Sequence, residues 1–304
     1  MNILITGGLG FIGSHLVDNL IKKKHKIFVI DNLSTGIKKN LNRNAKYFYY
    51  DLKSFISDNT KLNNFLRKYK IKVVYHLAAN ASVNASQEKP MNMINENFNS
   101  SVSLVESCKN TNVKKFIFAS TSAVYGEPIY LPVDESHPKR PISIYGLSKY
   151  LFENYLKFYS KKSEISSIIL RLPNVYGPRQ RTDLEGGVIA IFNNKLKSNK
   201  KIVIYGTGRQ KRDWVHVYDI VEAFTNSLKY RSNYEIFSIG SGIGFTVNKL
   251  FKLLCKKYNY EKKPIMKSAR PGDILNMIMK FEKAKRKLKW KPKLNFSKGI
   301  ELID

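Results

Sequence analysis

The stretch Thr6-Gly7-Gly8-Leu9-Gly10-Phe11-Ile12-Gly13 decides how this chain folds, because three of its glycines follow the spacing Gly-x-x-Gly-x-x-Gly. The apolar residues 3–6 before it are typical of a buried strand, and residues 11–21 after it repeat apolar side chains at the 3.6-residue period of a helix. Glycines at such a junction allow a tight turn and a close approach of the backbone to a bound phosphate. The pattern predicts a strand, a glycine-rich turn and a helix whose N-terminus binds a pyrophosphate.

Short apolar runs alternate with helix-period segments as far as about residue 170, which predicts an α/β fold with a doubly wound parallel sheet. We expect strands at 3–6, 27–31, 46–50, 73–76, 116–120, 168–171 and 234–239. We expect helices at 11–21, 62–69, 93–108 and 145–159, and loops at 174–187 and 206–212. The predicted domains are 1–173, with a returning strand and helix near 213–240, and a smaller, discontinuous α/β domain formed by 174–212 and 241–304.

The charge of the chain does not predict a nucleic-acid partner. The 304 residues carry 53 basic and 23 acidic side chains, a net charge of +30, but only 11 of the basic residues are Arg. Because Arg forks dominate specific phosphate and base recognition, we read this lysine excess mainly as solvated surface, with a role toward an anionic ligand or surface left open. The only cysteines, Cys108 and Cys255, are far apart, so neither a disulfide nor a metal site is expected. The sequence shows neither a membrane span nor a signal peptide, which predicts a cytoplasmic protein.

The ends of the predicted strands carry the residues expected to bind a dinucleotide. Asp31 ends the second strand, where its carboxylate can accept hydrogen bonds from a ribose 2′-hydroxyl and would repel a 2′-phosphate. This favours NAD over NADP. Asp51-Leu52 and Leu77-Ala78-Ala79 end the third and fourth strands and can line the same pocket. We interpret His76, beside them, as a hydrogen-bonded structural residue rather than a catalyst.

A second motif, Tyr145-Gly146-Leu147-Ser148-Lys149, opens a predicted helix and places a phenol and an ammonium four residues apart on one face. A nearby ammonium and a cationic nicotinamide both favour the phenolate, so the pKa of Tyr145 falls toward the neutral range that a general base requires. The hydroxyl cluster 120–122 ends the fifth strand and can hold a substrate hydroxyl beside this tyrosine.

Taken together, these motifs resemble the extended short-chain dehydrogenase/reductases, and among them the NAD-dependent nucleotide-sugar epimerases that act on UDP-glucose or UDP-N-acetylglucosamine. The resemblance covers essentially the whole chain. Besides the glycine stretch and the Tyr145 motif, the matching segments are 31–36, 120–126, 171–179, 205–219 and 270–273. Dehydratases and decarboxylases of this group carry an acidic residue after the catalytic Ser or Thr, whereas this chain reads Thr121-Ser122-Ala123. The resemblance therefore implies epimerisation.

In that family, the reaction oxidises C4 of a UDP-hexose to a 4-keto sugar and returns the hydride on the opposite face. The resemblance implies that Tyr145 is the base, that Lys149 holds the nicotinamide ribose and lowers the pKa of Tyr145, and that Thr121 bonds the migrating oxygen. It also implies a homodimer formed by the helices at 93–108 and 145–159, in which Tyr150, Leu151, Tyr155 and Phe158 could contribute to the interface.

The resemblance assigns two sets of binding residues. For NAD these are Gly7, Gly10, Phe11, Ile12, Gly13, Asp31, Asn32, Ser34, Thr35, Gly36, Asp51, Leu52, Leu77, Ala78, Ala79, Tyr145, Lys149 and Pro173. For the nucleotide sugar they are Thr121, Ser122, Asn174, Val188, Val203, Tyr205, Arg212, Arg270 and Asp273. Met277 stands where epimerases restricted to glucose and galactose have a bulky Tyr, so N-acetylated sugars are also expected substrates.

Two other interpretations stay open from the sequence. One is a sister reaction on another nucleotide sugar, such as a uronic acid 4-epimerase or another NAD-linked nucleotide-sugar oxidoreductase. The other is a non-catalytic NAD-binding protein that has kept the fold. The presence of Thr121, Tyr145 and Lys149 together argues against the second of these.

Overall fold

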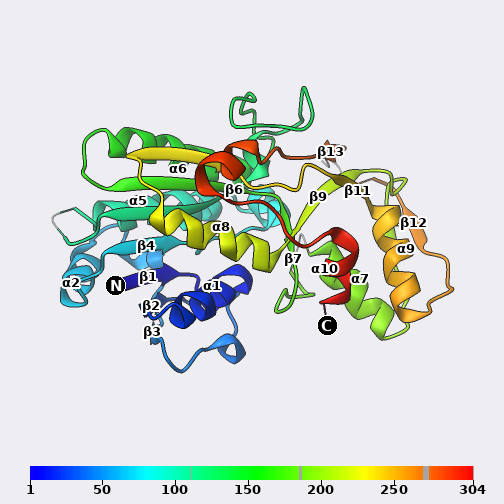
Figure 1. Cartoon of the computed structure of the whole chain (residues 1–304), viewed down its shortest axis with the longest axis horizontal. Helices are drawn as coiled ribbons and strands as arrows, with labels where there is room; N and C mark the ends of the chain where they lie inside the picture. Colours follow the sequence, from blue (N-terminus) through cyan, green and yellow to red (C-terminus); the bar gives the residue numbers. More distant parts are fainter. Residues whose placement is uncertain (110, 185–186, 270–273, 304) are drawn as a thin grey trace.

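A parallel sheet of seven strands forms the larger part of the protein (Figure 1). The computed structural model describes residues 1–109, 111–184, 187–269 and 274–303. The strands of the sheet are β1 (Asn2–Thr6), β2 (Lys26–Ile30), β3 (Lys46–Phe48), β4 (Val73–His76), β5 (Lys115–Thr121), β6 (Ser166–Leu172) and β10 (Tyr234–Ser238). All seven predicted strands are therefore present, with ends displaced by at most two residues.

The strand order is β10-β6-β5-β4-β1-β2-β3, and every neighbouring pair is parallel. The chain moves outward from β1 through β2 to β3, then returns to β4 on the other side of β1 and moves outward again. The direction of winding thus changes between β1 and β4. In such sheets the ligand lies at the carboxyl ends of the strands beside this switch point. The predicted doubly wound fold is confirmed.

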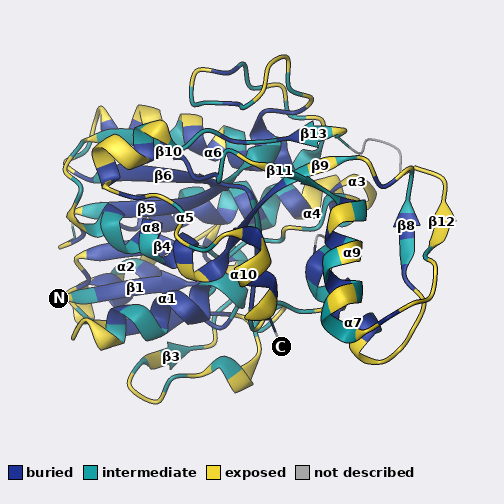
Figure 2. Cartoon of the chain, turned by 45° about the vertical axis from the view of Figure 1, so that its right-hand side comes forward, coloured by how far each residue is buried: buried dark blue, intermediate teal, exposed yellow. Residues whose placement is uncertain are grey.

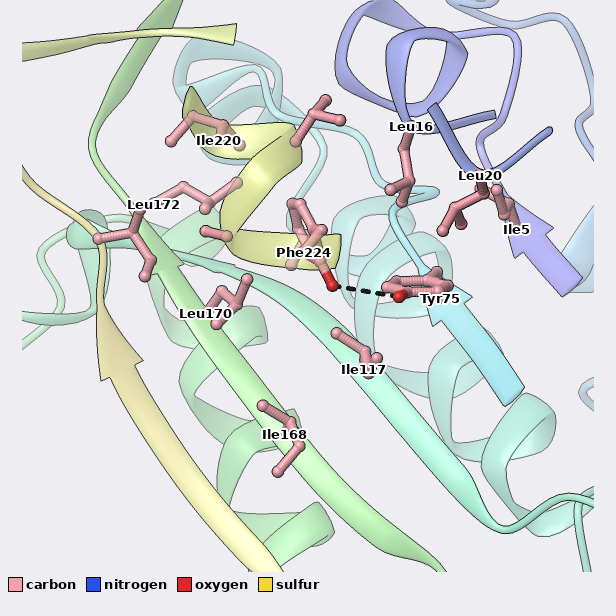
Figure 3. Close-up of a cluster of buried hydrophobic side chains, with 14 of the residues drawn as sticks. Ile5, Leu16, Leu20, Tyr75, Ile117, Ile168, Leu170, Leu172, Ile220 and Phe224 are labelled. Carbon is pink, nitrogen blue, oxygen red and sulfur yellow. Dashed lines mark hydrogen bonds between the residues drawn. The ribbon is translucent and has the colours of Figure 1, made fainter. Parts of the chain in front are cut away.

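Helices cover both faces of the sheet because alternate strand residues point to opposite sides. Ile3 and Ile5 of β1 pack on α1 (Phe11–Lys22) and α8 (Val217–Lys229), which lie side by side (Figure 3). Leu4, between them, packs on the opposite layer, which contains α2 (Thr60–Lys68), α5 (Ser100–Glu106) and α6 (Ile144–Ser160). The Tyr75 hydroxyl ties the first layer to the sheet by donating to the Phe224 carbonyl at 3.1 Å.

The remaining elements gather beyond the carboxyl ends of the large sheet, on the right of Figure 1. The strands of a second sheet are β7 (Asn174–Tyr176), β9 (Lys211–His216), β11 (Gly244–Thr246) and β13 (Asn276–Met277). A separate pair is formed by β8 (Val203–Tyr205) and β12 (Ile265–Lys267). The helices are α7 (Val188–Lys197), α9 (Val247–Tyr258) and α10 (Phe296–Glu301), whose buried faces form a core of their own (Figure 2).

Two sequence expectations differ from the structure. The predicted helix at 93–108 is divided into α4 (Pro90–Ile94), a π-helical turn at Asn95–Asn99, and α5. The π-turn lets the Asn97 side chain face the backbone of Asn80, to which it makes two hydrogen bonds of 2.9 Å. In addition, β7 and the start of β9 fall in segments predicted as loops, because β7 is too short to show a strand period. The division of the chain into two domains stays a prediction.

The two cysteines lie in different parts of the fold. Cys108 is buried and Cys255 is half-buried, and both are free thiols.

The short helix α3 (Val83–Glu88) completes the layer around α4 and α6. The remaining turns of helix are Lys38–Asn40, Leu52–Phe55, Ser122–Val124 and the π-helical Ala284–Leu288.

Candidate active site

The glycine-rich turn between β1 and α1 is packed too closely to accept larger residues. Gly7 has φ = +70°, and a Cβ there would lie 2.7 Å from the Ala78 amide nitrogen. A Cβ on Gly13 would lie 2.1 Å from the Gly7 carbonyl oxygen. The first turn of α1 therefore sits directly against the end of β1, and its free amides border the cavity beside the switch point.

Asp31, at the end of β2, fixes this turn from the neighbouring strand. One of its carboxylate oxygens accepts from the Leu9 amide at 2.9 Å and the other accepts from the Leu33 amide at 2.9 Å. A carboxylate offers about four acceptor positions, so each oxygen can still receive a hydroxyl. Gly36 approaches so closely that a Cβ would lie 2.6 Å from the carboxylate. Asp31 thus braces the turn and also keeps acceptor capacity at the rim of the cavity.

This cavity has a volume of about 670 Å³ and extends from the glycine turn to Pro173. It is lined by fifteen of the eighteen residues predicted to bind NAD: Gly7, Gly10, Phe11, Ile12, Gly13, Asp31, Asn32, Ser34, Thr35, Asp51, Leu52, Leu77, Ala78, Ala79 and Pro173. The other three, Gly36, Tyr145 and Lys149, do not line it.

The residues present suit a dinucleotide. The glycine turn offers amides at the positive end of a twelve-residue helix, the arrangement that binds a pyrophosphate. The Asp31 carboxylate lies at the end of β2, the strand next to β1. It suits a ribose with free hydroxyls and disfavours a 2′-phosphate. An adenosine and a nicotinamide riboside would then occupy the two ends of the cavity, on either side of the turn.

Tyr145 and Thr121 meet at the edge of a second cavity. Thr121 ends β5, and Tyr145 lies in the first turn of α6, whose start is capped by the Ser143 hydroxyl. Gly146 allows this approach, since a Cβ there would lie 2.6 Å from the Ala123 carbonyl oxygen. Burial raises the pKa of Tyr145, and the hydrogen bond with the Thr121 side chain opposes that rise. A hydroxyl and a phenol are therefore paired at one point, the arrangement needed to move a proton from a substrate hydroxyl.

Lys149 lies one helical turn behind Tyr145 and is only 2% exposed. Its ammonium donates to the Ala119 carbonyl at 3.0 Å, and it lines neither cavity. Burial lowers the pKa of Lys149 to about 7, while the carboxylate of Glu153 acts in the opposite direction. In this structure the ammonium therefore lies behind the wall that Ala119 contributes to the 670 Å³ cavity.

The second cavity has a volume of about 510 Å³ and lies between the large sheet and the smaller elements. Seven of the nine residues predicted to bind the nucleotide sugar line it: Thr121, Ser122, Asn174, Val188, Val203, Tyr205 and Arg212. The other two, Arg270 and Asp273, lie outside the described residues. The Met277 side chain also lines this cavity and is 4% exposed, packed on Tyr125 and Met279.

Sequence reasoning missed part of this wall. α7 presents Ile191, Phe192 and Lys195 to the cavity, in addition to Val188. Their spacing of three, four and seven residues from Val188 is that of one helix face, and this spacing was the available signal. Asn84 and Gln87 of α3 were also missed, because nothing in the sequence shows that this short helix reaches the site.

His76 lies at the end of β4, next to residues that line the 670 Å³ cavity. His76 is hydrogen-bonded to Thr6 and Ser101 at 2.7 Å each, which agrees with the structural role predicted for it. Across the described ranges, no three His, Cys, Asp or Glu side chains gather where they could hold a metal ion. None of the helices in the same ranges combines the length and apolar character that crossing a membrane requires.

Comparison with known proteins agrees with this geometry. The NAD dependent epimerase/dehydratase family matches residues 3–240. A putative UDP-glucose 4-epimerase of Methanocaldococcus jannaschii is 38% identical over 302 residues, which cover 99% of this chain and 96% of that protein. The crystal structure of the Thermotoga maritima UDP-glucose 4-epimerase with UDP-glucose superposes with a TM-score of 0.95 at 41% identity, covering 99% of this chain and 97% of the other.

A UDP-N-acetylglucosamine 4-epimerase of Methanobrevibacter ruminantium, in complex with UDP-N-acetylmuramic acid, has a TM-score of 0.91 at 35% identity and covers 98% of this chain and 95% of its own. A glycine-rich turn bordering a large cavity, next to a helix that carries Tyr-x-x-x-Lys, is typical of the extended short-chain dehydrogenase/reductases. Within that class, the chain belongs to the NAD-dependent epimerase/dehydratase family.

Proposed function

We propose that the protein is an NAD-dependent 4-epimerase of a UDP-hexose. The observation that carries this proposal is that the Thr121–Tyr145 pair lines the 510 Å³ cavity, which shares part of its wall with the 670 Å³ cavity. Ala81, Pro173 and Asn174 line both cavities, so the ligands in them would touch. The relatives named for UDP-glucose and UDP-N-acetylglucosamine epimerisation support the same reaction.

Each residue of the pair has a defined task in this reaction. NAD⁺, when bound, supplies the acceptor for a hydride. Tyr145 takes the proton of the sugar 4-hydroxyl through its phenol oxygen and later returns it, and Thr121 holds the same sugar oxygen by a hydrogen bond. Lys149 places a positive charge one turn behind the phenol, which favours the phenolate form of Tyr145. Positions 122 and 123 are Ser and Ala, so they do not supply the carboxylates with which dehydratases of this family would eliminate water.

The charges of the second cavity support a nucleoside-diphosphate sugar. Its described lining includes the basic side chains of Arg212 and Lys195 and no Asp or Glu. Around Tyr145 the lining is neutral, from Ser122, Ser143 and Asn84. We infer that the diphosphate lies toward Arg212 and that a neutral hexose lies against Tyr145. Met277, smaller at its tip than a tyrosine, is consistent with hexoses that carry a 2-acetamido group.

The test is direct. The purified protein is incubated with NAD and, separately, with UDP-glucose, UDP-galactose, UDP-N-acetylglucosamine and UDP-galacturonate, and the C4 epimers are separated by chromatography. We expect interconversion of a neutral pair without net accumulation of NADH. Interconversion of the uronate alone would identify a uronic acid 4-epimerase, and stoichiometric NADH would contradict epimerisation in favour of net oxidation.

We further propose that the protein works as a homodimer in the cytoplasm. Two of the four residues named for the dimer face, Leu151 and Phe158, are exposed on α6. Tyr155 instead turns inward and donates to Glu106, and Tyr150 packs near Met277. The proposed interface therefore rests on Leu151 and Phe158. Light scattering of the purified protein, compared with a Leu151→Glu/Phe158→Glu variant, tests it: a dimer that the double variant leaves intact would contradict this interface.

A further inference from the structure

The helix that carries Tyr145 and Lys149 carries a third polar side chain on the same face, that of Glu153. The spacing of four residues places the three side chains one above another along α6. Each of them contacts one of the last three residues of β5. The pairs are Tyr145 with Thr121, Lys149 with Ala119, and Glu153 with Ser120. Three successive turns of one helix thus hold three consecutive residues of one strand.

The contact made by Glu153 is fixed from both sides. The Ser120 hydroxyl donates to Glu153 Oε1 at 2.5 Å. On the neighbouring strand β6, Arg171 donates to the same carboxylate through Nε at 3.0 Å and through Nη2 at 2.6 Å. Arg171 and Glu153 are each 1% exposed. Arg171 also donates to the Tyr125 hydroxyl at 3.2 Å, so the pair is anchored to the turn that follows Thr121.

A buried ion pair of this kind is costly to desolvate and adds little stability over an apolar pair of the same size. Neither Glu153 nor Arg171 is in the described lining of the 510 Å³ or the 670 Å³ cavity, so contact with a ligand in either cavity does not explain the ion pair. What the pair does determine is the position of the end of β5 along α6. Small displacements there would separate Thr121 from Tyr145.

We propose that Glu153, clamped by Arg171, is a positioning residue that sets the register of the β5 end against α6 and so places Thr121 and Lys149 for proton transfer. The proposal rests on the proposed function for its kinetic test, because only the reaction reports whether Thr121 and Tyr145 are aligned. Glu153 and Arg171 themselves have no assigned role in the steps of that reaction.

The charge of Glu153 gives the proposal a second readout. Lys149 shares a helix face with Glu153 and Tyr145, and its charge acts on His76 of β4. Glu153 is in turn paired with Arg171 of β6. Phe118 of β5 lies under the Lys149 ammonium, 4.7 Å from the ring centre. Of these groups only Glu153 raises the pKa of Lys149, so neutralising that carboxylate lowers this pKa further.

Two variants distinguish the effect of the position of the β5 end from the effect of the charge of Glu153. Ser120→Ala removes the strand's contact with Glu153 and leaves the ion pair with Arg171 intact. Glu153→Gln removes the carboxylate charge. The matched control is Ser167→Ala, which removes a buried hydroxyl of β6 that has no hydrogen-bond partner among the described residues.

For Ser120→Ala we expect kcat to fall about 10-fold with KM nearly unchanged and the pH profile in place, because a misalignment of less than 1 Å can cost up to about 100-fold in rate. For Glu153→Gln we expect a fall of at least the same size, and the alkaline limb of kcat displaced by about one pH unit toward lower pH, where Lys149 loses its proton. Ser167→Ala should match the wild-type protein in kcat and pH profile.

A wild-type kcat in Ser120→Ala would overturn the proposal. A loss of kcat in Glu153→Gln that is the same at all pH values would also overturn it, because a purely structural role produces such a uniform loss. If Glu153→Gln does not fold, Ser120→Ala decides alone. Should the wild-type protein show no epimerase activity, the proposed function fails, and the inference is then judged by NMR titration of ¹³Cε-labelled lysine. The Lys149 signal, assigned with Lys149→Met, must titrate at lower pH in Glu153→Gln, and an unchanged titration would overturn the inference.

Discussion

The carboxylate of Asp31 accepts a hydrogen bond of 2.9 Å from the backbone amide of Leu9, so the end of β2 holds the turn that follows β1. The same carboxylate is the acceptor that we assign to the ribose of NAD. One side chain thus links the shape of the phosphate-binding turn to the choice of cofactor. A substitution of Asp31 should therefore alter both the shape of the turn and the choice of cofactor. A residue that only lines the cavity should not affect the shape of the turn.

Replacing Asp31 by Ala should weaken NAD binding about 10- to 100-fold, because a hydrogen bond to a charged group contributes about 1.5–3 kcal/mol. The same change should bring the affinities for NAD and NADP closer together, since the charge that repels a 2′-phosphate is gone. Calorimetric titration with both cofactors measures the ratio. Asn40→Ala, which removes another side chain that bonds to Leu9, is the control and should leave the ratio unchanged. An unaltered ratio in Asp31→Ala would contradict the assignment.

Tyr145→Phe removes the phenol that we assign as the base and keeps the ring. We expect kcat to fall about 100- to 10,000-fold, the usual contribution of general acid–base catalysis, with little change in NAD affinity. Steady-state rates with the preferred UDP-hexose measure the effect. Tyr155→Phe, on the same helix but bonded to Glu106, serves as the control for loss of a hydroxyl. Retention of full activity in Tyr145→Phe would rule out this tyrosine as the base.

Met277→Tyr should narrow the cavity at the hexose end, because Met277 lies in its wall and is packed against Tyr125. We expect kcat/KM for UDP-N-acetylglucosamine to fall at least 10-fold relative to that for UDP-glucose, since an overfilled pocket costs about 1–3 kcal/mol. Competition assays with mixed substrates give the ratio directly. A Met279→Leu variant, which alters the same cluster away from the cavity, should leave the ratio as it is.

Stability should decline as pH falls below about 6.5. Burial, helped by the charge of Lys149, lowers the pKa of His76 to about 3, whereas an exposed histidine titrates near 6.5. Between these values the unfolded chain binds a proton that the folded protein does not, so the stability present above pH 6.5 is lost as pH decreases. The expected slope is about 1.4 kcal/mol per pH unit for each such histidine.

Urea unfolding at pH 7.5, 6 and 5 measures this slope, and His76→Gln should reduce it by one histidine's share even if the variant is less stable throughout. His216, whose pKa burial lowers to about 4, remains in that variant and adds to the slope in both proteins. Equal slopes in the two proteins would mean that His76 accepts a proton in the folded state.

The sheet was predictable because each strand of a parallel sheet is apolar on both faces and the glycine turn fixes the first crossover. Most residues that line the 670 Å³ cavity were predictable as a group for the same reason, since they follow directly from strand ends. The π-turn at Asn95–Asn99 was not, because it depends on an Asn97 side chain that bonds to Asn80, and helical periodicity carries no information about that partner.

The position of Lys149 illustrates a different limit. Its spacing from Tyr145 predicted a shared helix face, and the structure places both on α6. What the spacing could not predict is the distant partner, the Ala119 carbonyl of β5, because a contact between a helix and a strand depends on how α6 packs on the sheet. The same holds for Glu153 of α6 and Arg171 of β6, which are separated by 18 residues in the chain and meet because α6 packs on β6.

Pro173 is the residue at which the larger sheet is continued into the smaller one. β6 ends at Leu172, Pro173 follows, and β7 begins at Asn174, so the chain leaves one sheet and joins the other within a single residue. Pro173 and Asn174 line both cavities. The relative position of the two cavities is therefore fixed at this point by covalent bonds and by the restricted φ angle of a proline, and not only by packing between the two sheets.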